Sequence, residues 1–285
     1  MVCCDPSEER ELEKNMRPSP NRFERDTSIQ PLGEGRFSVS INRGWWVQRG
    51  PNGGYIAAIL QRAISAAAQD PSRTPRSLTV HYTSPPVEGE ARVETRLERV
   101  GRSLTTVTAR LSQGEKLRAL AVAAVSTPRE SAEFYHASMP DVPAPEALPV
   151  AEPHIPVNER YEHRFVPEWS PRSGSEEAVT AAWIRTAEPH SLDYPLLAAY
   201  ADALPPALFA RANSMDEFAA VPTVDLTVHY RMDPASTRVG PDDFCLAVFR
   251  SRLAHSGYIE EDGEIWSRDG NLLAQSRQLA VILRD

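Results

Sequence analysis

The chain has 285 residues, of which 41% are hydrophobic and 25% are charged, as in globular proteins with one large domain or two small ones. Its net charge of −8 argues against non-specific nucleic-acid binding, which requires a basic face. No run of about 18 apolar residues is present, so no membrane span is expected. Three cysteines are too few for a disulfide framework, and the charged start lacks the apolar core of a secretory signal, so a cytoplasmic protein is expected.

Regular structure is predicted in two stretches, and the first lies at residues 26–127. The preceding residues 1–25 are polar and charged and are expected to form a disordered lead-in. A helix from Tyr55 to Ala68 is apolar on nearly every side and should therefore be buried. Alternating apolar and charged residues between Ala91 and Leu97 then predict a strand, and another is expected from Leu117 to Ser126.

A proline-rich segment separates the two stretches. Residues 128–172 contain nine prolines, which is typical of an extended linker. The second unit, residues 173–285, repeats the outline of the first, with an apolar helix predicted within Leu192–Phe209. Strands are then expected near residues 223–231, 244–252, 258–266 and 272–283.

The two units also share short sequences. The letters L-T-V-H-Y begin at Leu78 and again at Leu226, 148 positions later. Each unit has two glycines 13 residues apart: Gly101 and Gly114, and Gly257 and Gly270. A helix followed by an antiparallel meander, present twice, predicts an α+β protein built by duplication.

Four motifs carry a resemblance to a known family: W-W-V-Q-R-G-P-N-G-G-Y-I-A-A, Y-A-D-A-L-P-P-A-L, P-T-V-D-L-T-V-H-Y-R and A-Q-S-R-Q-L-A-V. Their order and spacing resemble the acyl-CoA thioesterase II family and its thioesterase-like relatives. The resemblance implies a double hotdog fold, in which two tandem helix-wrapped antiparallel sheets form a pseudo-dimer. It also implies hydrolysis of an acyl-CoA or acyl-carrier-protein thioester without cofactor or metal, and it leaves room for a homo-oligomer.

The family uses an Asp, a Thr or Ser, and a Gln to orient a hydrolytic water, and the matching positions are Asp202, Thr223 and Gln278. Asp202 follows an apolar helix that is expected to end before Pro205. Burial and the dipole of that helix would both raise the pKa of Asp202 toward the range of a general base. The alternative is an Asp whose side chain reaches solvent at a helix end.

The other candidate residues are less distinctive. Gln278 shares its expected strand face with small residues, which would leave room for a ligand, although a solvent-facing Gln is the commoner case. Thr223 is also typical of an ordinary β-branched strand residue. Gly53 and Gly54 open the first helix, where backbone N–H groups could polarise a substrate carbonyl oxygen, and a plain turn is the alternative. Trp45 and Trp46 precede this turn, and one of them would pack on an acyl chain or, as the simpler expectation, both pack in the core.

Two other functions are compatible with the same fold. Hotdog hydratases and dehydratases pair an Asp with a His five residues later, whereas Ala207 stands five residues after Asp202 here. A non-catalytic protein that binds acyl-CoA or acyl-carrier protein would retain the three residue types without using them. No G-x-S-x-G motif is present, so a serine-nucleophile hydrolase is not supported.

Overall fold

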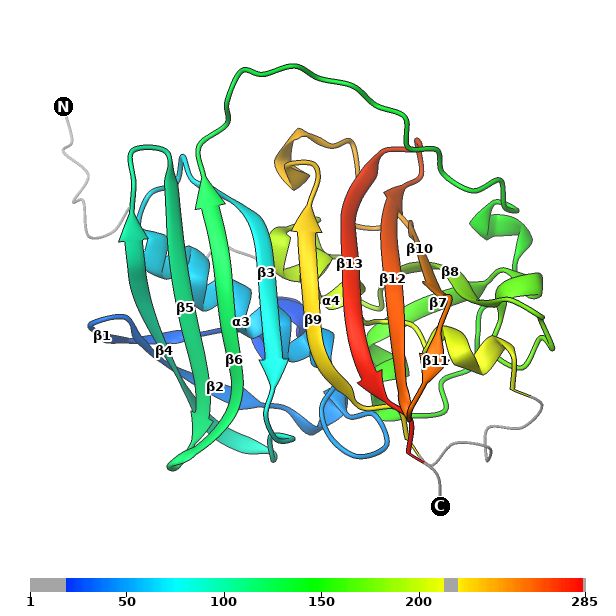
Figure 1. Cartoon of the computed structure of the whole chain (residues 1–285), viewed down its shortest axis with the longest axis horizontal. Helices are drawn as coiled ribbons and strands as arrows, with labels where there is room; N and C mark the ends of the chain where they lie inside the picture. Colours follow the sequence, from blue (N-terminus) through cyan, green and yellow to red (C-terminus); the bar gives the residue numbers. More distant parts are fainter. Residues whose placement is uncertain (1–18, 213–219, 284–285) are drawn as a thin grey trace, which may run out of the picture.

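The structure, a computed structural model, describes residues 19–212 and 220–283 and contains one continuous antiparallel sheet with helices on one face (Figure 1). The first half of the chain forms α2 (Arg22–Asp26), β1 (Gln30–Gly33), β2 (Arg36–Ile41), η1 (Arg43–Trp45), α3 (Gly53–Ala68), β3 (Thr74–Tyr82), β4 (Gly89–Val100), β5 (Leu104–Gln113) and β6 (Lys116–Ser126). Helix α3 begins where the Asn52 side chain accepts a hydrogen bond from the Tyr55 N–H. It is buried along most of its length, as predicted.

The second half repeats this order. Its elements are η2 (Pro145–Ala147), η3 (Pro156–Arg160), β7 (Tyr161–Phe165), η4 (Pro167–Trp169), β8 (Ala178–Thr186), α4 (Tyr194–Tyr200), η5 (Ala207–Ala210), β9 (Thr223–Tyr230), η7 (Pro234–Ser236), β10 (Cys245–Ser251), β11 (Ala254–His255), β12 (Tyr258–Ser267) and β13 (Leu272–Val281). The strands predicted in both halves are present, with boundaries that differ by a few residues.

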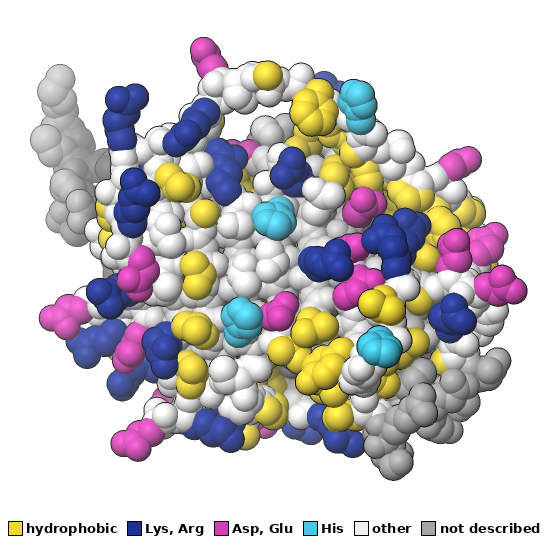
Figure 2. Space-filling model, viewed as in Figure 1, with side chains coloured by type: hydrophobic (Ala, Val, Ile, Leu, Met, Phe, Trp, Pro, Cys, Tyr) yellow, Lys and Arg dark blue, Asp and Glu magenta, His cyan; other side chains and the backbone are white. Residues whose placement is uncertain are grey.

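Across the sheet the strand order is β1-β2-β4-β5-β6-β3-β9-β13-β12-β10-β8-β7, with β11 paired to β12. Helix α3 lies behind the strands of the first half, and α4 packs behind β9 (Figure 1). The opposite face of the sheet carries acidic and basic side chains scattered among apolar ones (Figure 2). The main core therefore lies between the helices and the inner face of the sheet, and a second buried cluster that includes Trp183, Leu246 and Trp266 lies on the other face of β8, β10 and β12.

The second helix lies within the predicted range Leu192–Phe209 and ends before Pro205, as expected. Helix α4 stops at Tyr200, and only a short 3-10 helix, η5, follows. Pro205 and Pro206 interrupt the apolar run, because a proline removes a helical hydrogen bond and disfavours helical geometry in the residue before it. Asp202 consequently lies on a connecting segment beyond the helix.

The predicted disordered lead-in and the predicted extended linker both contain regular structure. Strand β7 lies within the predicted linker 128–172 and pairs with β8 at one end of the sheet. Helix α2 begins inside the predicted lead-in 1–25 and buries Phe23, while residues 1–18 lie outside the described residues. The composition of these segments is polar or proline-rich, yet each supplies an element that covers the core.

The repeated letters lie at the junction of the two halves. Strands β3 and β9 are neighbours, with Leu78 opposite Val228, Thr79 opposite Thr227, and Val80 opposite Leu226. The Thr79 and Thr227 hydroxyl oxygens are 3.0 Å apart. This reciprocal register defines a pseudo-two-fold axis between the two threonines. Strands β3 and β9 are therefore equivalent, one from each half of the chain.

We expect neither half to be stable as a monomer, because separation would expose the unpaired edge of β3 or β9. A shortened chain of residues 129–285 should therefore aggregate or associate through β9. Size-exclusion chromatography with light scattering checks this expectation, with hydrogen exchange to test for folding. A folded monomer of residues 129–285 would contradict it.

Candidate active site

Asp202 joins the second half of the chain to the first. Its Oδ2 atom accepts hydrogen bonds from the Gly54 N–H at 2.9 Å and from Asn52 Nδ2 at 3.0 Å. Asn52 Nδ2 also donates to the main-chain oxygen of Asp202 at 2.7 Å. The carboxylate therefore sits at the N-terminus of α3, where unpaired N–H groups and the helix dipole favour a negative charge.

Burial raises the pKa of Asp202 from 3.8 to about 6, and hydrogen bonds from Gly54, Gly53 and Asn52 oppose this shift. The predicted increase in the pKa of Asp202 is confirmed. The helix dipole was expected to add to this increase, but in the structure it opposes it. The nearest helix start belongs to α3 and stabilises the charge, whereas the prediction invoked the end of α4. The residue as a whole is partly exposed, although its carboxyl group is buried.

Thr223 and Gln278 lie together on adjacent strands. The Thr223 hydroxyl donates to Gln278 Oε1 at 3.0 Å, although 55 residues separate them in the chain. Gln278 is 7% exposed and lies on the inner face of β13 with the small residues Ala274, Ser276 and Ala280. The solvent-facing alternative for Gln278 is therefore wrong.

Glu261 completes this polar cluster and was missed by the sequence analysis. Gln278 Nε2 donates to Glu261 Oε1 at 2.6 Å, and the Ala207 N–H donates to Glu261 Oε2 at 2.5 Å. Burial raises its pKa to about 7, against the hydrogen bonds from Ala207 and Gln278, and the charge of Asp202 adds to the increase. An available signal was the alternation Ile259, Glu261, Gly263 and Ile265, which puts a carboxylate on an apolar strand face.

Aromatic and imidazole groups enclose the segment that follows α4. The Tyr82 hydroxyl donates to the Gly53 carbonyl oxygen at 2.8 Å, and burial followed by the charge of Asp202 raises the pKa of Tyr82 above its usual value. His163 Nε2 lies 3.1 Å from the Ala203 carbonyl oxygen. Burial lowers the pKa of His163 to about 4, so its ring is neutral near pH 7.

Gly53 and Gly54, whose N–H groups were predicted to polarise a substrate carbonyl oxygen, lie next to the Asp202 carboxylate. The Gly54 N–H donates to Asp202 in the structure. A Cβ atom on Gly53 would lie 2.9 Å from Asp202 Oδ2, and one on Gly54 would lie 2.5 Å from the Ala199 carbonyl oxygen. Side chains at these positions would collide with Asp202 and with α4 respectively. Their role as substrate-binding residues stays a prediction.

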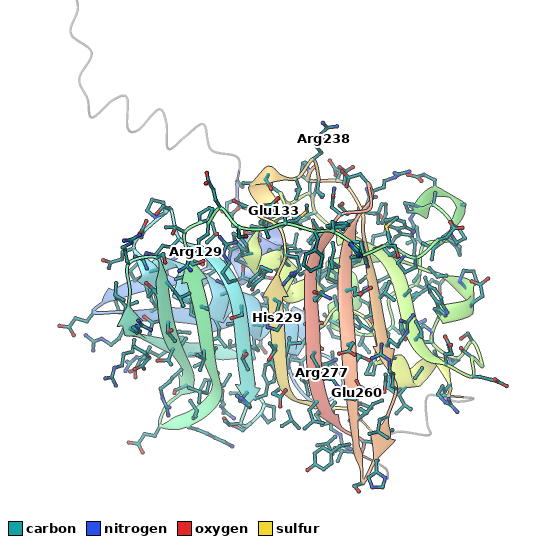
Figure 3. The ribbon with its side chains drawn as sticks, turned by 45° about the horizontal axis from the view of Figure 1, so that its top comes forward. Arg129, Glu133, His229, Arg238, Glu260 and Arg277 are labelled. Carbon is teal, nitrogen blue, oxygen red and sulfur yellow. The ribbon has the colours of Figure 1, made fainter. Side chains whose placement is uncertain are left out.

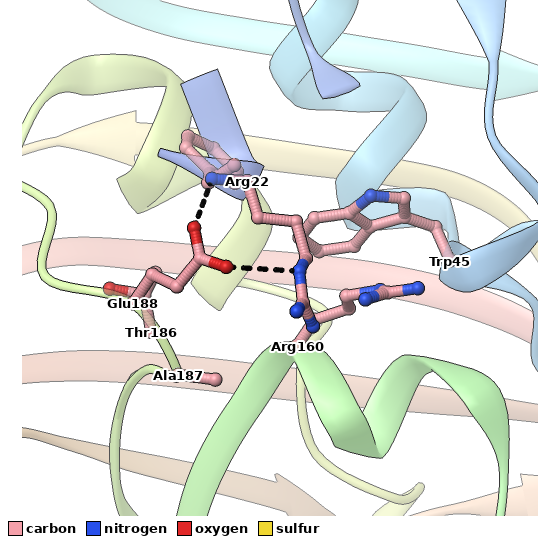
Figure 4. Close-up of a pocket in the computed structure, with 7 residues that line it drawn as sticks. Arg22, Trp45, Arg160, Thr186, Ala187 and Glu188 are labelled. Carbon is pink, nitrogen blue, oxygen red and sulfur yellow. Dashed lines mark hydrogen bonds and ion pairs between the residues drawn. The ribbon is translucent and has the colours of Figure 1, made fainter. Parts of the chain in front are cut away.

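Trp45 belongs to the core. It is 1% exposed, stacks on Tyr55 with ring centroids 4.9 Å apart, and donates from Nε1 to Asp26. A small cavity of about 10 Å³ beside it is lined by Arg22, Phe23, Trp45, Arg160, Thr186, Ala187 and Glu188 (Figure 4). That volume accommodates one water molecule and no acyl chain. The Arg22 side chain and main chain both contact Glu188 there, fastening α2 to the second half.

Within the two described ranges, no group of three or more His, Cys, Asp or Glu side chains is arranged to hold a metal ion. None of the helices described is long and apolar enough to cross a membrane.

Comparison with known proteins connects this fold and site to a class. A family model for the acyl-CoA thioesterase N-terminal domain matches residues 42–127, and one for the acyl-CoA thioesterase C-terminal domain matches residues 136–282. The two matches divide the chain as the pseudo-two-fold axis does, which identifies a double hot dog protein of the thioesterase type. The chain belongs to the acyl-CoA thioesterase family.

Solved structures confirm the predicted fold. A conserved protein of unknown function with a hot dog fold from Alicyclobacillus acidocaldarius is 29% identical, with a TM-score of 0.83 over 93% of this chain and 99% of that one. A candidate thioesterase II from Thermobifida fusca is 25% identical, with a TM-score of 0.80 over 94% and 99%. Acyl-CoA thioesterase II TesB2 from Mycobacterium marinum shares the fold at 19% identity, with a TM-score of 0.75 over 92% and 98%. No curated protein sequence matches this chain significantly.

Asp202→Asn should stabilise the protein at high pH. The raised pKa means that ionised Asp202 opposes folding above about pH 6, while near its ordinary value of 3.8 this contribution disappears. The variant should therefore raise the free energy of unfolding by about 1–3 kcal/mol at alkaline pH, with little change near pH 4. Urea unfolding at both pH values provides the measurement. Asp242→Asn, at an exposed position, should lack this pH-dependent gain.

Gly54→Ala should lower the free energy of unfolding by about 1–3 kcal/mol, because its Cβ would meet the rigid backbone of α4 at 2.5 Å. Gly240→Ala is the matched control, since the group nearest its Cβ is the exposed Asp243 side chain at 3.2 Å, which can move. Thermal unfolding of both variants tests the difference. Equal stability of the two variants would show that the close approach of α3 and α4 is unimportant.

Proposed function

We propose that this protein hydrolyses an acyl-CoA thioester to the free acid and CoA, with Asp202 as the general base. The observation that carries the proposal is the buried Asp202 carboxylate at the start of α3, with its pKa raised to about 6. A base of this strength is largely ionised near pH 7 and can still accept a proton from water. Membership of the acyl-CoA thioesterase family supports the thioester as the substrate.

Thr223 and Gln278 would fix the attacking water. Their mutual hydrogen bond leaves further hydrogen-bonding capacity on the Thr hydroxyl and the Gln amide, which is suited to holding a water molecule. Asp202 removes a proton from that water as its oxygen attacks the thioester carbonyl carbon. The tetrahedral intermediate then expels the CoA thiolate, which takes up a proton to give the free thiol. The positive end of α3 stabilises the developing oxyanion, and Gly53 and Gly54 are proposed as its donors once proton transfer to Asp202 weakens their hydrogen bonds to that carboxylate.

Thioester hydrolysis should be measured by thiol release across acyl-CoAs of graded chain length. The wild type should turn over at least one chain length, and Asp202→Asn should reduce kcat by roughly two orders of magnitude or more, as expected for loss of a general base. The wild-type rate should fall as pH drops below about 6, because protonated Asp202 is not a base. Asp242→Asn should retain wild-type activity.

The alternatives predict different results. A wild type that binds acyl-CoA without releasing thiol would favour a non-catalytic binding protein. Activity on acyl-carrier-protein thioesters alone would assign the carrier protein as partner. If Asp202→Asn retains wild-type kcat, Asp202 is not the base even though the protein is a thioesterase.

A further inference from the structure

We propose that Glu261 is a positioning residue of this site, which fixes the amide of Gln278 and ties the segment carrying Asp202 to the sheet. The inference rests on the proposed function and deepens it. Glu261 lies on the inner face of β12, directly opposite Gln278 of β13, and is 4% exposed.

The hydrogen bonds of Gln278 determine which way its amide points. Its nitrogen donates to Glu261 Oε1 at 2.6 Å, and its oxygen accepts from the Thr223 hydroxyl at 3.0 Å. With Glu261 ionised, a rotated amide would put its oxygen against the carboxylate oxygen, where two acceptors repel each other. Glu261 therefore leaves one arrangement of the Gln278 amide and keeps its oxygen directed to Thr223.

The second oxygen of Glu261 holds the chain on the other side of the site. It accepts from the Ala207 N–H, at the start of η5 and five residues after Asp202. Asp202 is itself fixed by Asn52 and Gly54. The segment from Asp202 to Ala207 is thus anchored at both ends. Glu261 anchors it at Ala207, and the same carboxylate orients Gln278.

The first half of the chain shows that the fold does not require a carboxylate here. Leu78 and Leu226 are equivalent across the pseudo-two-fold axis, and they pair with Ala123 and Gln278 respectively. Ala123 pairs in turn with Val107, just as Gln278 pairs with Glu261. The buried pair Val107 and Ala123 therefore occupies the positions that Glu261 and Gln278 occupy in the second half. Burying a carboxylate is costly. Of the two equivalent positions, only the one beside Gln278 carries a carboxylate, which indicates that Glu261 serves the candidate site rather than the fold.

The outer face of β12 has a different character. Glu260 points away from the helices and lies 3.6 Å from Arg277 of β13, in an exposed group of charges (Figure 3). Glu264 also lies on this outer face, where it accepts from Trp266 Nε1 at 3.2 Å. Glu264→Gln preserves an acceptor for Trp266 and provides a control on the same strand.

The experiment compares full-length Glu261→Gln, Glu261→Val and Glu264→Gln on the acyl-CoA that the wild type hydrolyses fastest. Glu261→Gln puts an amide where two N–H donors need acceptors, and Glu261→Val removes both acceptors. Each should lower kcat by about tenfold or more with KM changed far less, because orientation of the reacting groups is lost. Glu264→Gln should keep the wild-type kcat and KM.

A double-mutant cycle separates positioning from folding. Gln278→Ala combined with Glu261→Val recreates the Val107 and Ala123 pair of the first half, so this double variant should fold with a Tm near or above that of the wild type. If Glu261 acts through Gln278, adding Glu261→Val to Gln278→Ala should lower kcat little further. Independent, multiplying losses of kcat would overturn the role of Glu261 in orienting Gln278.

The possible failures are distinguishable. A wild type with no hydrolytic activity would overturn the proposed function and this inference together. An active wild type whose folded Glu261→Gln and Glu261→Val variants retain kcat would overturn this inference alone. A loss of kcat that only follows the fraction of unfolded protein would also overturn it, because Glu261 would then be structural.

Discussion

The site depends on the hydrogen bonds that Asn52 and Gly54 donate to Asp202. These bonds cross from the start of α3 in the first half to the segment after α4 in the second. They require a close approach of the two helices, which the missing side chain of Gly54 permits beside the Ala199 carbonyl oxygen. Asp202 comes from one half of the chain and its hydrogen-bond donors come from the other. The two halves must therefore pair through β3 and β9 before the site is complete.

This arrangement buries two acidic groups, which disfavours their ionised forms. Burial raises the pKa of both Asp202 and Glu261, and the charge of Asp202 adds to the increase at Glu261 because like charges disfavour ionisation. Donors from α3, η5 and β13 offset part of the penalty. A protein selected for stability alone would place apolar side chains here, as it does at Val107 and Ala123. The polar cluster therefore supports the proposal that the reaction takes place there.

The sequence predicted the duplication because the junction uses the same strand twice, and it predicted the buried α3 from a continuous apolar run. It also predicted that α4 ends before Pro205, because a proline cannot continue a helix, but not that the helix stops as early as Tyr200. Strand β7 was not predicted, because the prolines around it indicated an extended linker. Glu261 stands in the letters E-E-D-G-E, which resemble a solvated charge run until alternate residues are assigned to opposite faces. The partners of Asp202 were inaccessible because they lie 148 to 150 residues away.

The pseudo-two-fold axis relates two halves that are similar in backbone and unequal in chemistry. A symmetric pair of identical chains would present its polar residues twice, whereas the duplication lets one half carry the acids and amide and the other half contribute a helix start. At the positions equivalent to Glu261 and Gln278, the first half is apolar. A ligand that needs this polar cluster should therefore saturate at one equivalent per chain, although the fold occurs twice. Substitutions in the two halves consequently affect different parts of one shared site.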